Sequence, residues 1–276
     1  MTGHEGHWGC VYEDVGWFLR EHLPEVYRRL VDEGEAALEA AGPSPSPAGL
    51  PLVGHFDRRG EIRHLMIHLV DHGKKTLRFV TAYPYNTVGV THQIRVTQVI
   101  GRANEAEGQI KGVTRGGAFI AFFDPLYFLN KGCYQVGKSY DFNLSALAYH
   151  ARPVAGRYIE VPVTEQIRRL LGEENPPPGP TVQVSTSGLA ALLPYESRDV
   201  DDFAFQAPVG RPHRFRFEGR PVHRLPATVM RPEDEDFQVM LYIADHVFPP
   251  GVEPKEGDDL TGVLWMQGYL AGPPAH

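Results

Sequence analysis

Residues 139–149 have the sequence SYDFNLSALAY, in which apolar and polar side chains alternate from Tyr140 to Ser145. Alternation with a period of two is typical of a β-strand that buries one face. The stretch follows residues 132–138, GCYQVGK, whose glycines and polar residues are typical of turns. We therefore predict that a strand begins at Ser139.

Further short strands surround this one in the sequence. We predict them at residues 92–101, 107–114, 118–123 and 157–161. A non-strand insert at 125–132 separates the third strand from the fourth. Five strands with an insert before the fourth are the layout of an OB-type small barrel. Upstream, residues 63–70 and 76–83 alternate around a polar turn, which predicts a β-hairpin. Residues 51–162 are thus expected to hold a hairpin and a first OB-like barrel.

The C-terminal part of the chain has a similar organisation. We predict strands at residues 202–208, 213–217, 222–230, 237–244 and 260–270. A shift of 120 residues aligns Gly137 with Gly257, Leu144 with Leu264, and Tyr149 with Tyr269. We interpret this as an internal repeat, with a second OB-like barrel at 199–276.

The segments 122–151 and 257–272, FFDPLYFLNKGCYQVGKSYDFNLSALAYHA and GDDLTGVLWMQGYLAG, resemble parts of a bacterial protein family with tandem OB-like β-units. The resemblance covers about the C-terminal two-thirds of the chain. It implies a recurrent β-unit, but no activity and no catalytic residues.

Two segments have a different composition. Residues 1–50 are predicted to form a helical segment, with apolar residues at helical spacing over 11–41, and a Pro/Ser linker, AGPSPSPAGLP, from residue 41. Residues 163–198 are predicted to hold a short helix at 163–172 and then a Pro-rich linker. The expected fold class is mainly β (α+β), with two OB-like small barrels in tandem and an N-terminal helical segment.

Composition limits the functional classes. Of 276 residues, 42% are hydrophobic and 22% charged, which is typical of a globular protein. We expect no membrane segment, because no apolar run reaches the roughly 18 residues that a membrane helix needs. The N-terminus has no signal-peptide pattern, and Cys10 and Cys133 are the only cysteines, so we expect a cytoplasmic protein. The net charge of −7 argues against non-specific coating of nucleic acid.

One motif suggests nucleotide binding. Residues 132–139, GCYQVGKS, fit the P-loop pattern through Gly132, Gly137, Lys138 and Ser139. A true P-loop leads into a helix whose N-terminus binds phosphate, whereas a strand is predicted after Ser139. We therefore favour a plain turn, with phosphate binding as the alternative.

A basic segment suggests nucleic-acid binding. Residues 211–231 contain six arginines and one acidic residue, interleaved with aromatic residues. Exposed arginines beside aromatic rings suit single-stranded nucleic acid. The candidate residues are Arg211, Arg214, Arg216, Arg220 and Arg224. Alternatively, these arginines pair with the acidic segment 232–260, which has nine carboxylates and one lysine.

Histidines give a third candidate site. His64, His68 and His72 lie in and after one predicted strand, and His4, His7 and Cys10 are three residues apart. Zinc requires three or four such ligands to converge, and no compact zinc motif is present. A metal site at His64, His68 and His72 therefore remains a hypothesis.

These observations favour a non-catalytic binding protein without a cofactor. The first expected partner is single-stranded nucleic acid, bound through the arginines. The second is a basic protein, bound by the acidic surface, and a nucleotide- or metal-dependent enzyme is the third alternative. The oligomeric state does not follow from the sequence.

Overall fold

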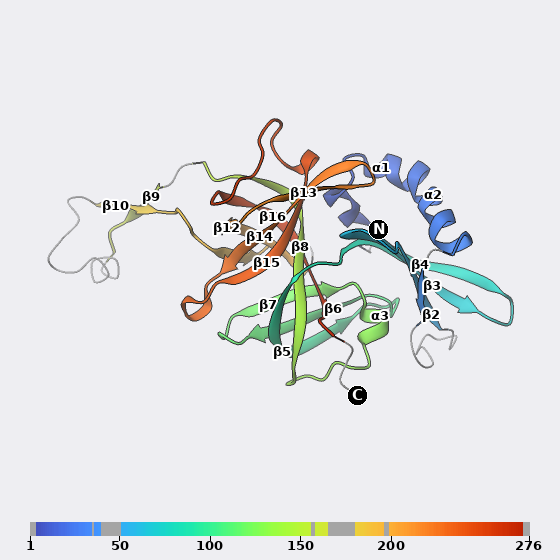
Figure 1. The fold of residues 1–276 in the computed structure, drawn as a ribbon. Coiled ribbons are helices and arrows are strands. Elements are labelled where there is room, and N and C mark those ends of the chain that lie inside the picture. The colour runs from blue at the N-terminus through green and yellow to red at the C-terminus, as the bar shows by residue number, and fades with distance from the viewer. Residues whose placement is uncertain are drawn as a thin grey trace.

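The computed structural model describes residues 4–34, 36–39, 51–155, 158–164, 180–195 and 199–272. The helix predicted at 163–172 lies outside these residues except for its first two positions. The fold is mainly β, with a short N-terminal helical segment, as the sequence predicts (Figure 1). No helix in the described parts of the chain has the length and apolar character needed to span a membrane.

The N-terminal segment begins with a 3-10 helix, η1 (His4–Cys10), followed by one continuous helix over residues 15–32. This helix consists of α1 (Val15–Trp17), η2 (Phe18–His22), α2 (Leu23–Tyr27) and η3 (Arg28–Asp32), of which η2 and η3 are π-helical. The Asp14 carboxylate caps it by accepting a 2.7 Å hydrogen bond from the Trp17 N–H. The predicted helical pattern continues to residue 41, but the helix ends at Asp32, and residues 37–39 pair as a strand instead.

A four-stranded antiparallel sheet follows, and the helix packs against it. Its strands, in spatial order, are β1 (Ala37–Glu39), β2 (Leu52–Phe56), β3 (Ile62–Asp71) and β4 (Thr76–Asn86). The predicted hairpin is confirmed as β3 and β4, which pair from Asp71 and Thr76 at the turn. The 3-10 helix η1, the helix over residues 15–32 and this sheet together form what we call the N-terminal unit.

A closed five-stranded barrel lies beside this unit. Its strands are β5 (Val90–Gly101), β6 (Gly108–Thr114), β7 (Phe119–Asp124), β8 (Ser139–Pro153) and β16 (Asp259–Leu270), and α3 (Tyr127–Asn130) lies between β7 and β8. The spatial order is β16-β7-β6-β5-β8, and β8 pairs again with β16 to close the ring. Only β7 and β16 are parallel neighbours.

The fifth strand of this barrel is not the one expected at 157–161. That segment is β9 (Tyr158–Pro162), which pairs with β10 (Thr181–Ser185) in a separate two-stranded sheet. Strand β16, from the end of the chain, takes the fifth position. Alternation identifies a strand and its buried face, but it does not identify the neighbour with which the strand pairs.

The remaining strands continue around the same β8–β16 pair. They are β11 (Ala191–Pro194), β12 (Asp202–Pro208), β13 (His213–Phe217), β14 (Arg220–Met230) and β15 (Phe237–Ala244), with η4 (Pro232–Asp234) and η5 (Asp245–Val247) between strands. Strand β12 pairs with β16, and β15 pairs with β8. An isolated bridge between Val209 and Ala227 links the β12 and β14 segments. The two units that the sequence places in tandem therefore share β8 and β16.

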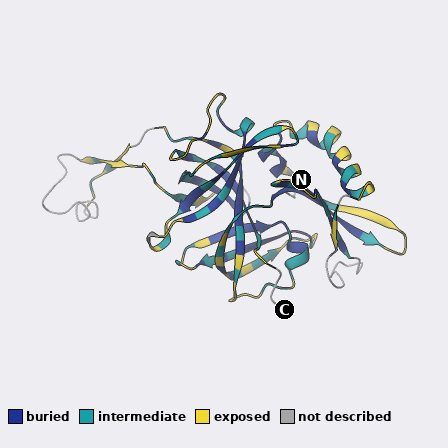
Figure 2. Cartoon of the chain, viewed as in Figure 1, coloured by how far each residue is buried: buried dark blue, intermediate teal, exposed yellow. Residues whose placement is uncertain are grey.

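Two hydrophobic clusters hold this arrangement together. One lies among the barrel strands, and the other lies between the N-terminal unit and the barrels, where Trp8, Tyr83, Phe123 and Trp265 are all buried (Figure 2). The same interface contains buried hydrogen bonds. Gln267 accepts one from the Asn86 N–H at 3.0 Å and donates one to the Pro84 carbonyl at 3.0 Å.

Candidate functional site

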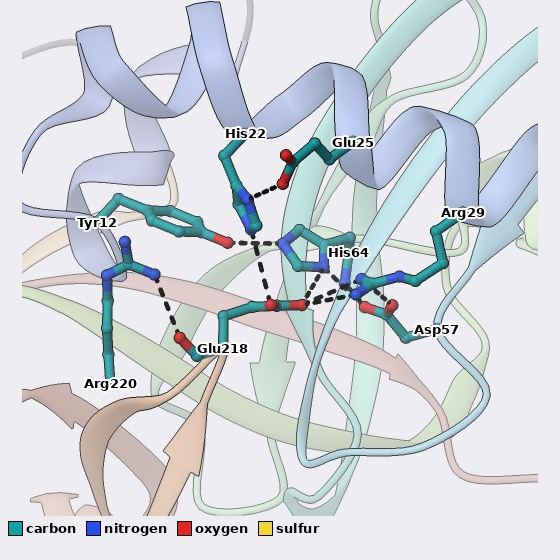
Figure 3. Close-up of polar contacts among 8 residues, drawn as sticks. All are labelled: Tyr12, His22, Glu25, Arg29, Asp57, His64, Glu218 and Arg220. Atoms are coloured by element: carbon teal, nitrogen blue, oxygen red, sulfur yellow. Dashed lines mark hydrogen bonds and ion pairs between the residues drawn. The ribbon is translucent and has the colours of Figure 1, made fainter.

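Eight polar and aromatic side chains meet where the N-terminal helix, the β2–β3 sheet and the β13–β14 hairpin come together (Figure 3). We call this group the helix–hairpin cluster. Its members are Tyr12, His22, Glu25, Arg29, Asp57, His64, Glu218 and Arg220. They come from four separate stretches of the chain.

The local fold places each member of the cluster. His22, Glu25 and Arg29 are three and seven residues apart, so that they lie on one face of the helix. Asp57 follows β2, and His64 lies in β3. Glu218 occupies the two-residue turn between β13 and β14, where Glu218 and Gly219 have φ values of 48° and 77°. Two positive φ values are typical of a type I′ hairpin turn, a conformation that glutamate rarely adopts.

Asp57, His64 and Tyr12 form a hydrogen-bonded chain. His64 Nδ1 lies 2.8 Å from Asp57 Oδ2, which also accepts the His64 backbone N–H at 2.7 Å. The Tyr12 hydroxyl lies 2.8 Å from His64 Nε2. The chain is satisfied when His64 carries its proton on Nδ1 and accepts the tyrosine proton at Nε2.

Burial and charge shift the acidities in this chain. Burial alone raises the pKa of Asp57, but the hydrogen bonds and charge of His64 and the charge of Arg29 outweigh it and lower that pKa. Burial, with the nearby carboxylate of Glu218, raises the pKa of Tyr12 well above its ordinary value. The cluster therefore holds Asp57 ionised and Tyr12 protonated.

Arg29 and His22 connect this chain to the hairpin turn. Arg29 donates to Asp57 Oδ1 at 2.7 Å and to Glu218 Oε1 at 3.1 Å. His22 Nδ1 lies 3.3 Å from Glu25 Oε2, and His22 Nε2 lies 3.7 Å from Glu218 Oε2. His22 Nε2 makes no hydrogen bond within the described residues. Each imidazole of the cluster thus has one nitrogen fixed by a carboxylate.

A second cation, Arg220, closes the cluster on the other side. Its guanidinium carbon lies 4.6 Å from the centre of the Tyr12 ring and 5.4 Å from that of Trp17. These are cation–π distances. A pocket of about 260 Å³ opens beside the cluster, and its lining includes Arg29, Asp57, Phe217 and Glu218. Tyr12 and His64 are buried and do not line this pocket, so the Asp57–His64–Tyr12 chain reaches it only at Asp57.

The predicted nucleic-acid residues do not form one free cationic strip. Arg214 pairs with Asp245 at 3.0 Å and with Glu253 at 2.9 Å, and Arg224 pairs with Glu61 at 2.8 Å. Arg220 belongs to the cluster. Arg216 is exposed and donates to the Gly219 carbonyl, and Arg211 is exposed. The pairing of Arg214 with 232–260 is the alternative that the sequence left open.

The P-loop-like segment lies in turns at the entrance to β8. Gly132, Gly137, Lys138 and Ser139 are all exposed, and Gly137 has a φ of 89°. A strand follows Ser139, as predicted, and the short helix α3 precedes the segment. The helix N-terminus that a P-loop offers to phosphate is not present at this position.

The three histidines of the predicted metal site lie apart. His64 belongs to the cluster, whereas His68 contacts Tyr27, His55 and Phe79, with ring centres 5.5, 5.2 and 5.7 Å away. His72 is exposed in the β3–β4 turn. Burial, and then the charge of His55, lowers the pKa of His68 to about 4. His68 and His72 therefore do not join His64 in one metal site.

Sequence reasoning missed the partners of His64. Tyr12, His22, Asp57 and Glu218 form no short motif, since they span more than two hundred residues. One local signal was available. Glu218-Gly219 lies between two β-like stretches and predicts a hairpin turn, which places the glutamate at the end of the hairpin.

Comparisons of this chain with protein-family models, with curated proteins and with solved structures give no match. The resemblance of segments 122–151 and 257–272 to a bacterial family thus remains an expectation.

Proposed function

We propose that this protein is a binding protein that docks a partner protein through the two-stranded sheet of β9 and β10, which we call the arm. The arm extends away from the barrels (Figure 1). The observation that carries the proposal is an aliphatic face on the arm that the described residues leave largely uncovered.

The register of the arm defines this face. Ile159 pairs with Val184, and Val161 pairs with Val182, so that four branched aliphatic side chains lie on one side. Ile159 is 53% exposed and Val184 is 41% exposed. An isolated two-stranded sheet is only marginally stable in water, and a covering surface would stabilise it.

The charge of the arm points to the kind of partner. Among residues 158–164 and 180–195, Glu160 is the only charged residue, so these residues offer no cation to a phosphate. An apolar face beside an acid, on a chain of net charge −7, complements an apolar protein surface with a basic rim. The sequence also suggests a basic protein as its second alternative, but there the binding surface is the acidic segment 232–260.

The strand order of the barrel also supports the arm as the place where a partner binds. Numbered along the chain, its strands β5, β6, β7, β8 and β16 have the closed order 1-2-3-5-4-1, with a helix between the third and fourth. We infer an OB-type barrel from this order. OB barrels bind through the face of strands two and three and through the loops between strands one and two and between four and five. Here part of the face of strands two and three is covered. Tyr83 of β4 packs against Phe123, and Gln109 donates a hydrogen bond to Asp201. The arm lies in the connection between strands four and five.

Site-specific photocrosslinking in the cells that naturally make the chain tests this proposal. A photoreactive phenylalanine replaces Tyr158, which is 64% exposed on the arm, and the matched control replaces Phe119, which is 79% exposed on the barrel. We expect one discrete protein adduct from position 158, identified by mass spectrometry, absent from position 119 and lost with Ile159→Asp and Val184→Asp. The same adducts from both positions, no adduct, or an adduct to a second copy of the chain would each overturn the proposal.

Single-stranded nucleic acid is the second candidate, because the same strand order is common among oligonucleotide-binding barrels. The exposed Arg211 and Arg216 are the available contacts. We expect labelled single-stranded DNA or RNA to bind with a steep salt dependence, and the double variant Arg211→Gln/Arg216→Gln to reduce the log–log slope by about 1.4. Absence of binding at low salt would eliminate this candidate.

A further inference from the structure

We propose that His22, His64 and Glu218 form a site for a divalent transition-metal ion, of the kind that zinc occupies. One ligand atom from each of these residues lies within 4.8 Å of the others. This site differs from the one expected at His64, His68 and His72, and it does not depend on the proposed docking function.

The orientation of Glu218 supports this assignment. Arg29 binds its Oε1 at 3.1 Å, whereas its Oε2 faces His22 Nε2 at 3.7 Å. Zinc binds nitrogen and oxygen at about 2.0–2.1 Å, which puts neighbouring ligands of a tetrahedral site about 3.4 Å apart. The His22–Glu218 pair is therefore almost correctly spaced to share an ion, and the ligand atom of His64, within 4.8 Å of the other two, would have to move inward to reach it.

The carboxylates behind the two histidines provide independent support. Glu25 lies 3.3 Å from His22 Nδ1, and Asp57 lies 2.8 Å from His64 Nδ1. Metal-binding histidines almost always donate their second ring N–H to a carboxylate, a carbonyl or water, which orients the ring and makes the free nitrogen more basic. Both cluster histidines already have this partner at Nδ1. Nε2 of His22 makes no hydrogen bond within the described residues, whereas Nε2 of His64 holds the Tyr12 hydroxyl, which an ion would displace. Ion binding would therefore break the hydrogen bond between the Tyr12 hydroxyl and His64 Nε2, now 2.8 Å long.

The charges and the ligand types suggest which ion fits. Glu25, Asp57 and Glu218 carry three negative charges, and Arg29 and Arg220 carry two positive charges, so the cluster without metal has a net charge of −1. Two imidazoles and one carboxylate favour zinc, cobalt or nickel over magnesium and calcium, which prefer oxygen ligands. The pocket lined by Asp57 and Glu218 reaches the Glu218 side of the cluster, whereas His22 and His64 are not among its lining residues.

Titration of the chelator-treated full chain with zinc, by calorimetry against a competing chelator, tests the site. We expect one ion per chain, and at least about tenfold weaker binding in His22→Ala and in Glu218→Gln. His72→Ala is the matched control, because His72 is exposed outside the cluster, and its affinity should equal that of the unmodified chain. Absence of zinc binding, or equal affinity in His22→Ala, would overturn the proposal.

Cobalt spectroscopy provides a test that misfolding cannot imitate. The variant His22→Cys keeps a ligand at this position but changes its chemistry. We expect cobalt(II) to give a new near-ultraviolet thiolate-to-cobalt band in His22→Cys that is absent from the unmodified chain and from His72→Cys. A cobalt complex without this band would place residue 22 outside the coordination sphere and overturn the assignment.

Discussion

At the scale of single residues, the burial of His68 makes the free energy of unfolding depend on pH. It is 0% exposed, and neither ring nitrogen has a hydrogen-bond partner within the described residues. Burial and the charge of His55 lower its pKa to about 4, whereas an unfolded chain has a histidine pKa of about 6.5. The unfolded state therefore binds more protons between these values, so the free energy of unfolding falls as the pH drops from about 6.5 to about 4.

The variant His68→Phe removes this titration and retains an aromatic ring against Tyr27 and Phe79. We expect the loss of unfolding free energy between pH 6.5 and 4 to become smaller, by at most about 3 kcal/mol. Urea unfolding at a series of pH values measures the free energy of unfolding and therefore this loss. His72→Phe, in the exposed turn, should leave the pH dependence unchanged. An unaltered pH dependence in His68→Phe would show that His68 is not the source.

At the scale of elements, the antiparallel pair of β8 and β16 connects the closed barrel to the strands β11–β15. Residues 139–144 of β8 pair with β5, and residues 145–147 pair with β15, while β16 runs along the other edge of β8. Gly262 lies opposite Ala151 in this pair, and a Cβ there would be 2.1 Å from the His150 carbonyl oxygen. The two backbones can approach this closely only because residue 262 is glycine.

Gly262→Ala should therefore lower the free energy of unfolding by about 1–3 kcal/mol or more, because the backbone of β8 has to move. The midpoint of urea unfolding measures the loss. Gly132→Ala is the control, since a Cβ at residue 132 meets nothing within 4 Å, and its midpoint should stay near that of the unmodified chain. Equal midpoints for the two variants would contradict the close approach of the strands.

At the scale of the whole molecule, the N-terminal unit and the barrels share one hydrophobic interface. Trp8 from the N-terminal unit and Trp265 from β16 are both fully buried in the same cluster. The buried Asn86 side chain also donates to Ser145 of β8 at 3.1 Å. Separation of the two parts would expose this surface, which links their unfolding.

We expect a single cooperative urea transition, with tryptophan fluorescence and far-ultraviolet circular dichroism changing together. Fluorescence reports on the buried Trp8 and Trp265 at the interface and on the more exposed Trp17, whereas circular dichroism reports on strands throughout the chain. Removal of residues 1–86 should produce a chain that binds a hydrophobic dye, because Phe123 and Trp265 lose their cover. Two separated transitions would mean that the parts fold independently.

The sequence by itself determined most strands and their buried faces. The predictions at 202–208, 213–217 and 237–244 agree with β12, β13 and β15 at both ends. The turn before Ser139 was also predicted, since Gly137 marks it. These features follow from residues close together in the chain, where side-chain periodicity and turn preferences act directly.

Only the tertiary structure decided how the strands are paired and which side chains meet. Strand β16, and not the segment 157–161, is the fifth strand of the barrel, and strands β12 and β15 also pair with β16 and β8. His64 gained Tyr12, His22 and Glu218 as neighbours rather than His68 and His72. The physical reason is that pairing and convergence depend on burying surfaces that are distant in sequence, and no local pattern encodes the partner of a buried face.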